Sequence, residues 1–138
     1  ILIKAPKPHL SHSVVVKTHE IAENPAKAQE NIAKQLNLGV TGIMFVGVES
    51  AEEVKQGLAA MRFKSKGGTR SEDVGNAPAF WGMSEKEYKE KADLWPLSPN
   101  GELVNWVITA GICGDVKCQV LDYIRLWHIG LGYLYWEV

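Results

Sequence analysis

The side chains best suited to chemistry form one run, Lys17-Thr18-His19-Glu20, which begins with the last residue of the valine-rich segment 13–17. Consecutive apolar residues are typical of a strand that is buried on both faces. A lysine at the end of such a strand can attract a carboxylate, and His19 and Glu20 could reach the same face. The alternatives are a solvated strand end for Lys17 and plain loop positions for His19 and Glu20.

The segment that organises the chain is a second apolar run, 41–48, followed at once by a helix signal. Ser50 and Glu53 have the spacing of a capping box, which predicts a helix over 51–62. The buried stripe expected on this helix consists of Val54, Leu58 and Met61. A strand that runs directly into an amphipathic helix is half of a βαβ unit, and its functional edge is the carboxyl end of the strand.

The same order occurs earlier in the chain. Asn24 as N-cap and Pro25 at the first helical position predict a helix over 25–38 that ends at Gly39. A third strand is expected at 103–108. The fold class predicted by this order is α/β with parallel strands and right-handed crossovers. The buried stripe of the first helix consists of Ala28, Ile32 and Leu36.

Composition bounds the class of protein. The chain has 138 residues, enough for one domain, with 46% hydrophobic and 22% charged residues. A net charge of −1 gives no electrostatic reason to expect nucleic acid or an anionic membrane as partner. No apolar run reaches the roughly 18 residues that a bilayer-spanning helix needs. Cys113 and Cys118 are interpreted as free thiols in a reducing, cytoplasmic compartment rather than as a zinc site.

Three further stretches carry weaker signals. His9 and His12 could bind a metal if they were helical, but Pro8 favours a solvated loop. The polar stretch 63–78 contains Gly67-Gly68 and Arg70, which could wrap an anion, with a flexible loop as the alternative. Ser84 and Glu87 predict another capped helix, which ends before Pro96. The tail 109–138 fits no clear pattern, although 116–126 could be a helix and 129–138 a strand.

Several segments, taken in order, resemble the HpcH/HpaI aldolase/citrate lyase family. They are Val14-Val-Val-Lys17, Gly42-Ile-Met-Phe-Val-Gly-Val-Glu-Ser-Ala-Glu-Glu-Val54, Met61-Arg-Phe63 with Gly68-Thr-Arg70, and Ala79-Phe-Trp-Gly82. The resemblance covers roughly residues 13–108. It implies a partial (β/α)₈ TIM barrel, about strands three to five with their helices, followed by a divergent tail at 109–138. It also implies a carbon–carbon lyase that acts on pyruvate-like 2-oxo acids through an enolate stabilised by Mg²⁺ or Mn²⁺, and a homo-oligomer.

The resemblance also assigns site residues and shows where this chain departs from the family pattern. Lys17 stands where the family usually has an arginine that binds the substrate carboxylate and the enolate oxygen, so the bidentate fork of arginine is lost. Lys17 and His19 are the catalytic candidates. Ala110 stands where the family has a metal-binding glutamate, and the strands that carry the catalytic histidine and the other metal ligand have no counterpart. No metal ligand is therefore expected within this chain.

Two hypotheses follow. In the first, the chain belongs to a metal-dependent aldolase in which Lys17 holds the substrate carboxylate. In the second, it is a truncated or rearranged piece without catalysis, at most an interaction module, because the resemblance stops abruptly after Ile108. Whether the chain is an enzyme stays open between them.

Overall fold

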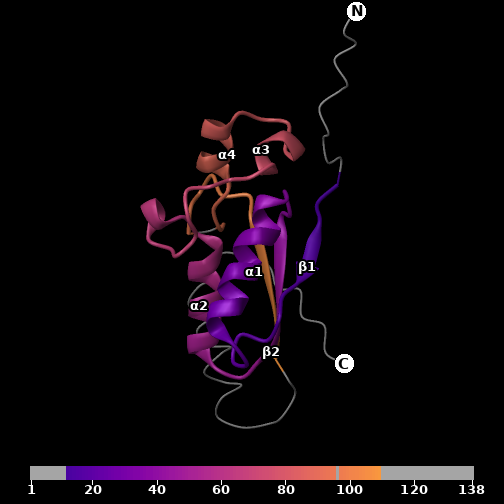
Figure 1. Ribbon diagram of the computed structural model, residues 1–138, viewed down its shortest axis with the longest axis vertical. Coiled ribbons are helices and arrows are strands. Elements are labelled where there is room, and N and C mark those ends of the chain that lie inside the picture. The colour runs from indigo at the N-terminus through magenta and orange to yellow at the C-terminus, as the bar shows by residue number, and fades with distance from the viewer. Residues whose placement is uncertain (1–11, 96, 110–138) are drawn as a thin grey trace, which may run out of the picture.

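The computed structural model describes residues 12–95 and 97–109, and these form a small α/β unit. Three strands and four α-helices occur in the described ranges, together with one short 3₁₀ turn (Figure 1). In chain order they are β1 (Val15–Lys17), α1 (Pro25–Asn37), β2 (Gly42–Val48), α2 (Ala51–Met61), η1 (Lys64–Lys66), α3 (Ala77–Phe80), α4 (Glu85–Lys91) and β3 (Val104–Thr109).

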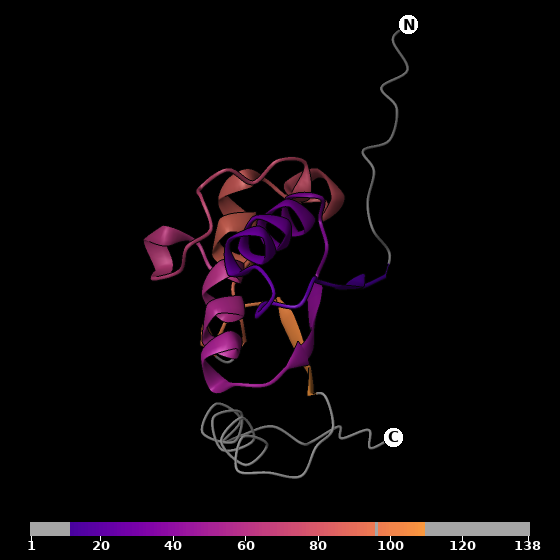
Figure 2. The same cartoon turned by 60° about the horizontal axis from the view of Figure 1, so that its bottom comes forward.

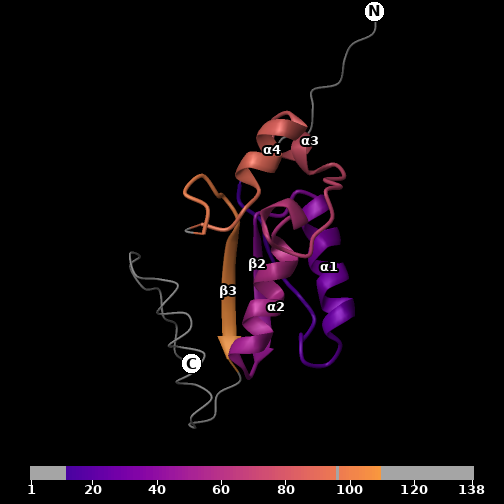
Figure 3. The same cartoon turned by 90° about the vertical axis from the view of Figure 1, so that its left-hand side faces the viewer.

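The strands form one parallel sheet in the order β1-β2-β3, so β2 lies between the other two (Figure 2). Helices α1 and α2 lie together on one side of this sheet, while α3 and α4 lie beyond the amino ends of the strands (Figure 3). The strands and the two long helices are therefore where the sequence predicts them, within two residues at each end.

The starts of both long helices are built from the expected side-chain caps. Asn24 Oδ1 accepts a hydrogen bond from Lys27 N at 3.1 Å, and Ser50 Oγ accepts one from Glu53 N at 3.3 Å. Helix α1 stops at the position where Gly39 has φ +92°, the left-handed conformation that glycine adopts without steric cost. The predicted caps and helix end are confirmed.

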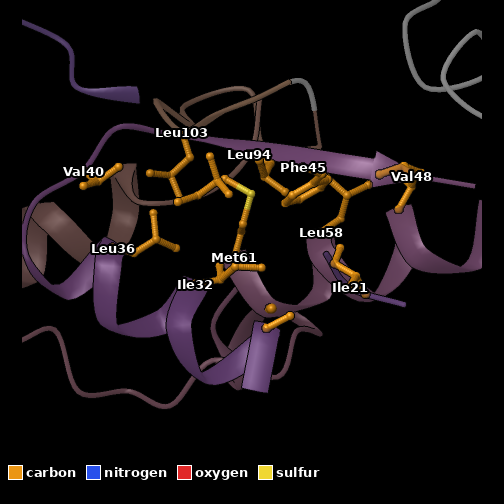
Figure 4. Close-up of a cluster of buried hydrophobic side chains, with 14 residues drawn as sticks. Ile21, Ile32, Leu36, Val40, Phe45, Val48, Leu58, Met61, Leu94 and Leu103 are labelled. Carbon is orange, nitrogen blue, oxygen red and sulfur yellow. The ribbon is translucent and has the colours of Figure 1, made fainter. Parts of the chain in front are cut away.

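The core fills the space between the sheet and its two helices (Figure 4). Every residue of both predicted helix stripes is buried there. Phe45 from β2 packs so closely on α2 that a Cβ at Gly57 would come within 2.6 Å of its ring. Deep burial of these apolar side chains, each worth about 1.5–3 kcal/mol, fixes which face of the sheet the helices cover.

The stretch 63–78 contains a loop, as predicted, but its Arg70 is buried against protein groups, which corrects the alternative that this arginine wraps an anion. Phe63 and Arg70 form a β-bridge around η1, and the stretch runs into α3, a helix the sequence did not predict. Arg70 is only 2% exposed, and its Nη2 donates to Asn37 Oδ1 at 2.6 Å and to the hydroxyl oxygen of Tyr88 at 3.1 Å. Its guanidinium also lies 4.4 Å from the centre of the Phe63 ring. The arginine thus ties this stretch to α1 and α4.

Several predictions fall outside the described residues. They concern His9, the position of Ala110, both cysteines, and the elements suggested for the tail. His12 is described and lies in a bend rather than a helix. Strand β3 includes Thr109, so it extends one residue past the predicted end of the regular pattern.

Candidate functional site

Lys17 is the last residue of β1, and its side chain belongs to the face of the sheet that α1 and α2 do not cover. Alternation along the strand decides this, because successive side chains point to opposite faces. Val14 and Val16 pack against the core, whereas Val15 and Lys17 are exposed. The predicted site residue therefore lies at the carboxyl end of a parallel strand, on its open face.

The register places two large apolar side chains beside Lys17 on that face. Lys17 pairs with Met44 of β2, and Met44 pairs with Trp106 of β3. Trp106 is 43% exposed and Val104, two residues earlier, is 47% exposed. The row Lys17–Met44–Trp106 thus combines one cation with an exposed apolar surface. Trp106 was not identified as a site residue from the sequence, since its role depends on a register that only the assembled sheet defines.

The residue after Lys17 turns toward the helices. Thr18 N donates to Met44 O at 3.1 Å, which extends the pairing of β1 by one residue, and Gln35 Nε2 from α1 donates to Lys17 O at 3.0 Å. Thr18 is only 6% exposed. Its Oγ1 and the Oε1 of Gln35 are buried and have no hydrogen-bond partner among the described residues. A buried polar atom without a partner costs about 1–3 kcal/mol.

Glu20 lies against the end of β2. Gly47 has φ +61°, and the pairing of β2 with β3 is irregular between Phe45 and Val48. A Cβ at position 47 would come within 2.7 Å of Glu20 Oε1, so the carboxylate fills the space that a side chain there would need. This contact brings a third polar group of the run 17–20 to the carboxyl edge of the sheet.

A hollow of about 290 Å³ separates the end of β1 from α1, and we call it the β1–α1 hollow. Its lining contains no acidic side chain. Lys34 at its border forms an ion pair with Glu30 at 2.6 Å, and this hydrogen bond lowers the pKa of the Glu30 carboxyl. Lys17 and His19 form no ion pair with any described residue. The lining residues are Lys17, Thr18, His19, Asn31, Lys34, Gln35 and Leu38.

The side chains around Lys17 do not fit a divalent metal. His19 and Glu20 are the nearest ligand types along the chain, and within the described ranges no three His, Cys, Asp or Glu side chains gather closely enough to hold an ion. Octahedral Mg²⁺ or Mn²⁺ bound through protein carboxylates would need ligands from elsewhere.

Comparisons with models of protein families, with curated proteins and with solved structures gave no significant match to this chain. In the part of the chain that the structure describes, no helix has the length and apolar character needed to cross a membrane. What the fold and site define is a parallel α/β unit in which Lys17 ends a strand at the carboxyl edge of the sheet.

Proposed function

We propose that the chain is part of a carbon–carbon lyase of the HpcH/HpaI aldolase/citrate lyase type, acting on pyruvate-like 2-oxo acids, in which Lys17 binds the substrate carboxylate. One observation carries the proposal: Lys17 ends a parallel strand on the face that the helices leave open. In a β/α barrel this face lines the interior, and the carboxyl ends of the strands carry the active site.

Lys17 has the chemistry that this role needs. Its ammonium group has three N–H donors and a full charge, and it forms no ion pair with a described carboxylate. Met44 and Trp106 in the same row would shield one side of a bound carboxylate from water, which strengthens its attraction to the lysine. Binding the carboxylate of the ground state does not by itself accelerate a reaction, so Lys17 orients the substrate.

The rest of the proposal reaches beyond the described residues. A divalent ion, Mg²⁺ or Mn²⁺, would supply enolate stabilisation when bound, but the described side chains provide no ligand set for it. Assignment of β1, β2 and β3 to the third to fifth strands of a barrel, assembly as a homo-oligomer and a cytoplasmic location belong to the same proposal.

A second candidate function is that of a non-catalytic interaction module. It is favoured by the open face of the sheet, on which Val15, Val104 and Trp106 are each more than two-fifths exposed. Exposed apolar side chains on one surface are typical of sites that contact another protein. This candidate needs no oxo-acid binding at Lys17, so a binding measurement separates the two.

The test is a titration of the ¹⁵N-labelled chain with pyruvate, followed by the backbone amide signals of Lys17, Thr18 and Met44. The aldolase proposal predicts saturable shifts that Lys17→Gln removes. Lys27→Gln makes the same charge change on an exposed residue of α1 and serves as the matched control. Pyruvate shifts that are absent, or equal in both variants, would refute the proposal and favour the interaction module.

A further inference from the structure

We infer that the β1–α1 hollow is a binding site for a small anion that also carries a hydroxyl group. The charge of its lining is the first observation. Two lysines and a histidine border the hollow, and no carboxylate lines it. One of the lysines, Lys34, also forms an ion pair with Glu30. An anion entering the hollow therefore meets Lys34 and His19 without an acidic competitor among the lining residues.

The second observation is independent of charge. Two lining residues, Thr18 and Gln35, each carry a buried oxygen that lacks a hydrogen-bond partner among the described residues. The Nε2 of Gln35 donates to Lys17 O, and so its Oε1 is the oxygen left over. Polar atoms buried in this way are normally satisfied by protein, water or a ligand.

The two oxygens define what the ligand must offer. Thr18 Oγ1 can donate a hydrogen bond to an anionic oxygen, whereas Gln35 Oε1 can only accept one. Neither oxygen is open to solvent in the structure, so both side chains must rotate toward the hollow to reach a ligand. A ligand that then satisfies both combines an anionic group with an O–H donor. A volume of about 290 Å³ lies at the lower end of the range for ligand sites and suits a molecule of few atoms.

This site goes beyond the proposed function. Oxo-acid binding uses the open face of the sheet, while the hollow lies between β1 and α1 and relies on Thr18, Lys34 and Gln35. Lys17 borders both. Variants of Thr18 and Lys34 therefore test the hollow without removing the residue on which the aldolase proposal depends.

The experiment is a titration of the ¹⁵N-labelled 138-residue chain with D-glycerate, glycerol 3-phosphate and propanoate. Glycerate carries a carboxylate and hydroxyls, glycerol 3-phosphate replaces the carboxylate by phosphate, and propanoate lacks the hydroxyl. We expect saturable shifts of the Thr18, His19, Asn31 and Gln35 amides with at least one of the two hydroxylated anions. The tighter of the two identifies carboxylate or phosphate as the anionic group, and propanoate should bind at least threefold more weakly.

Two variants and a control complete the test. Thr18→Val keeps the side-chain shape and should weaken binding of the hydroxylated anion at least threefold, as should Lys34→Gln, whereas Lys27→Gln should leave it unchanged. The inference is overturned if neither hydroxylated anion shifts these signals, if propanoate binds equally well, or if Thr18→Val binds like the unmodified chain. Loss of glycerate binding in Thr18→Val with pyruvate binding retained would separate this site from the proposed function.

Discussion

Lys17 pairs with Met44 across the first two strands, and both side chains belong to the sheet face that α1 and α2 leave uncovered. A cation beside a flexible apolar side chain can hold an anion on one side and exclude water on the other. This relationship connects the fold to the proposed carboxylate site, since it places the charge at the edge where parallel α/β units carry their chemistry.

The contact between Glu20 and Gly47 should be measurable as a coupling. Gly47→Ala should lower the free energy of unfolding by about 1–2 kcal/mol for the left-handed backbone alone, and further because its Cβ meets Glu20. In a Glu20→Ala background, the additional destabilisation caused by the contact with Glu20 should vanish. Urea unfolding of the two single variants and the double variant should give a coupling of at least about 0.5 kcal/mol. Strictly additive effects would show that the carboxylate is not held against Gly47.

Removal of the Tyr88 hydroxyl should destabilise the fold. The hydroxyl accepts a hydrogen bond from Arg70 and donates one to Leu36 O at 3.3 Å, both in buried surroundings. Tyr88→Phe removes both of these buried hydrogen bonds and should cost about 1–2 kcal/mol in urea unfolding, while Arg70 keeps Asn37 and Leu36 O keeps Gly39 N as partners. Thr18→Val is a matched control, because it removes a buried hydroxyl without a partner and should be neutral or stabilising. Equal costs in the two variants would contradict these assignments.

The same tyrosine predicts a loss of stability at high pH. Burial raises the pKa of the Tyr88 hydroxyl above its ordinary value of 10.0, and the positive charge of Arg70 opposes this only in part. Above about pH 10 the unfolded chain loses the tyrosine proton before the folded chain does, so the free energy of unfolding falls as the pH rises. Urea titrations at pH 8.5, 9.5 and 10.5 should show a steeper fall in the unmodified chain than in Tyr88→Phe. Parallel pH profiles would mean that the hydroxyl is not buried.

The purified 138-residue chain should not release pyruvate from a 4-hydroxy-2-oxo acid in a Mn²⁺-dependent manner. The described residues bring no three metal-ligating side chains together, and the family resemblance places Ala110 where a glutamate ligand is expected. The assay varies the Mn²⁺ concentration at a fixed concentration of the 4-hydroxy-2-oxo acid and measures the rate of pyruvate release. Metal-dependent turnover that disappears in Lys17→Ala would contradict the account and would direct attention to His19 and Glu20 as ligands.

The long helices could be predicted from local signals because those signals act over a few residues. Asn24 and Ser50 as caps, Gly39 as the helix end, and the apolar stripes at a spacing of three to four residues all depend on near neighbours. The strand segments were equally visible as short apolar runs.

The rest of the fold and of the candidate site could not be predicted, because it depends on contacts between residues that are far apart in the sequence. Arg70 is buried and donates hydrogen bonds to Asn37 and Tyr88, 33 and 18 residues away, so the polar residues beside it in the sequence gave no sign of this burial. Trp106 joins the row of Lys17 only through the register of three strands. The buried oxygens of Thr18 and Gln35, which have no hydrogen-bond partner among the described residues, are likewise brought together only when α1 packs beside β1. None of these has a local signal in the sequence.

The central claim, that Lys17 binds the carboxylate of a 2-oxo acid, is tested most directly by comparing pyruvate affinity in three chains by calorimetry or amide shifts. Lys17→Gln should lose binding, whereas Lys17→Arg should bind pyruvate more tightly than the unmodified chain, because the planar guanidinium can hold a carboxylate through two parallel hydrogen bonds. An affinity order of Arg above Lys above Gln supports the account. Equal pyruvate affinity in the Lys and Gln chains would contradict it.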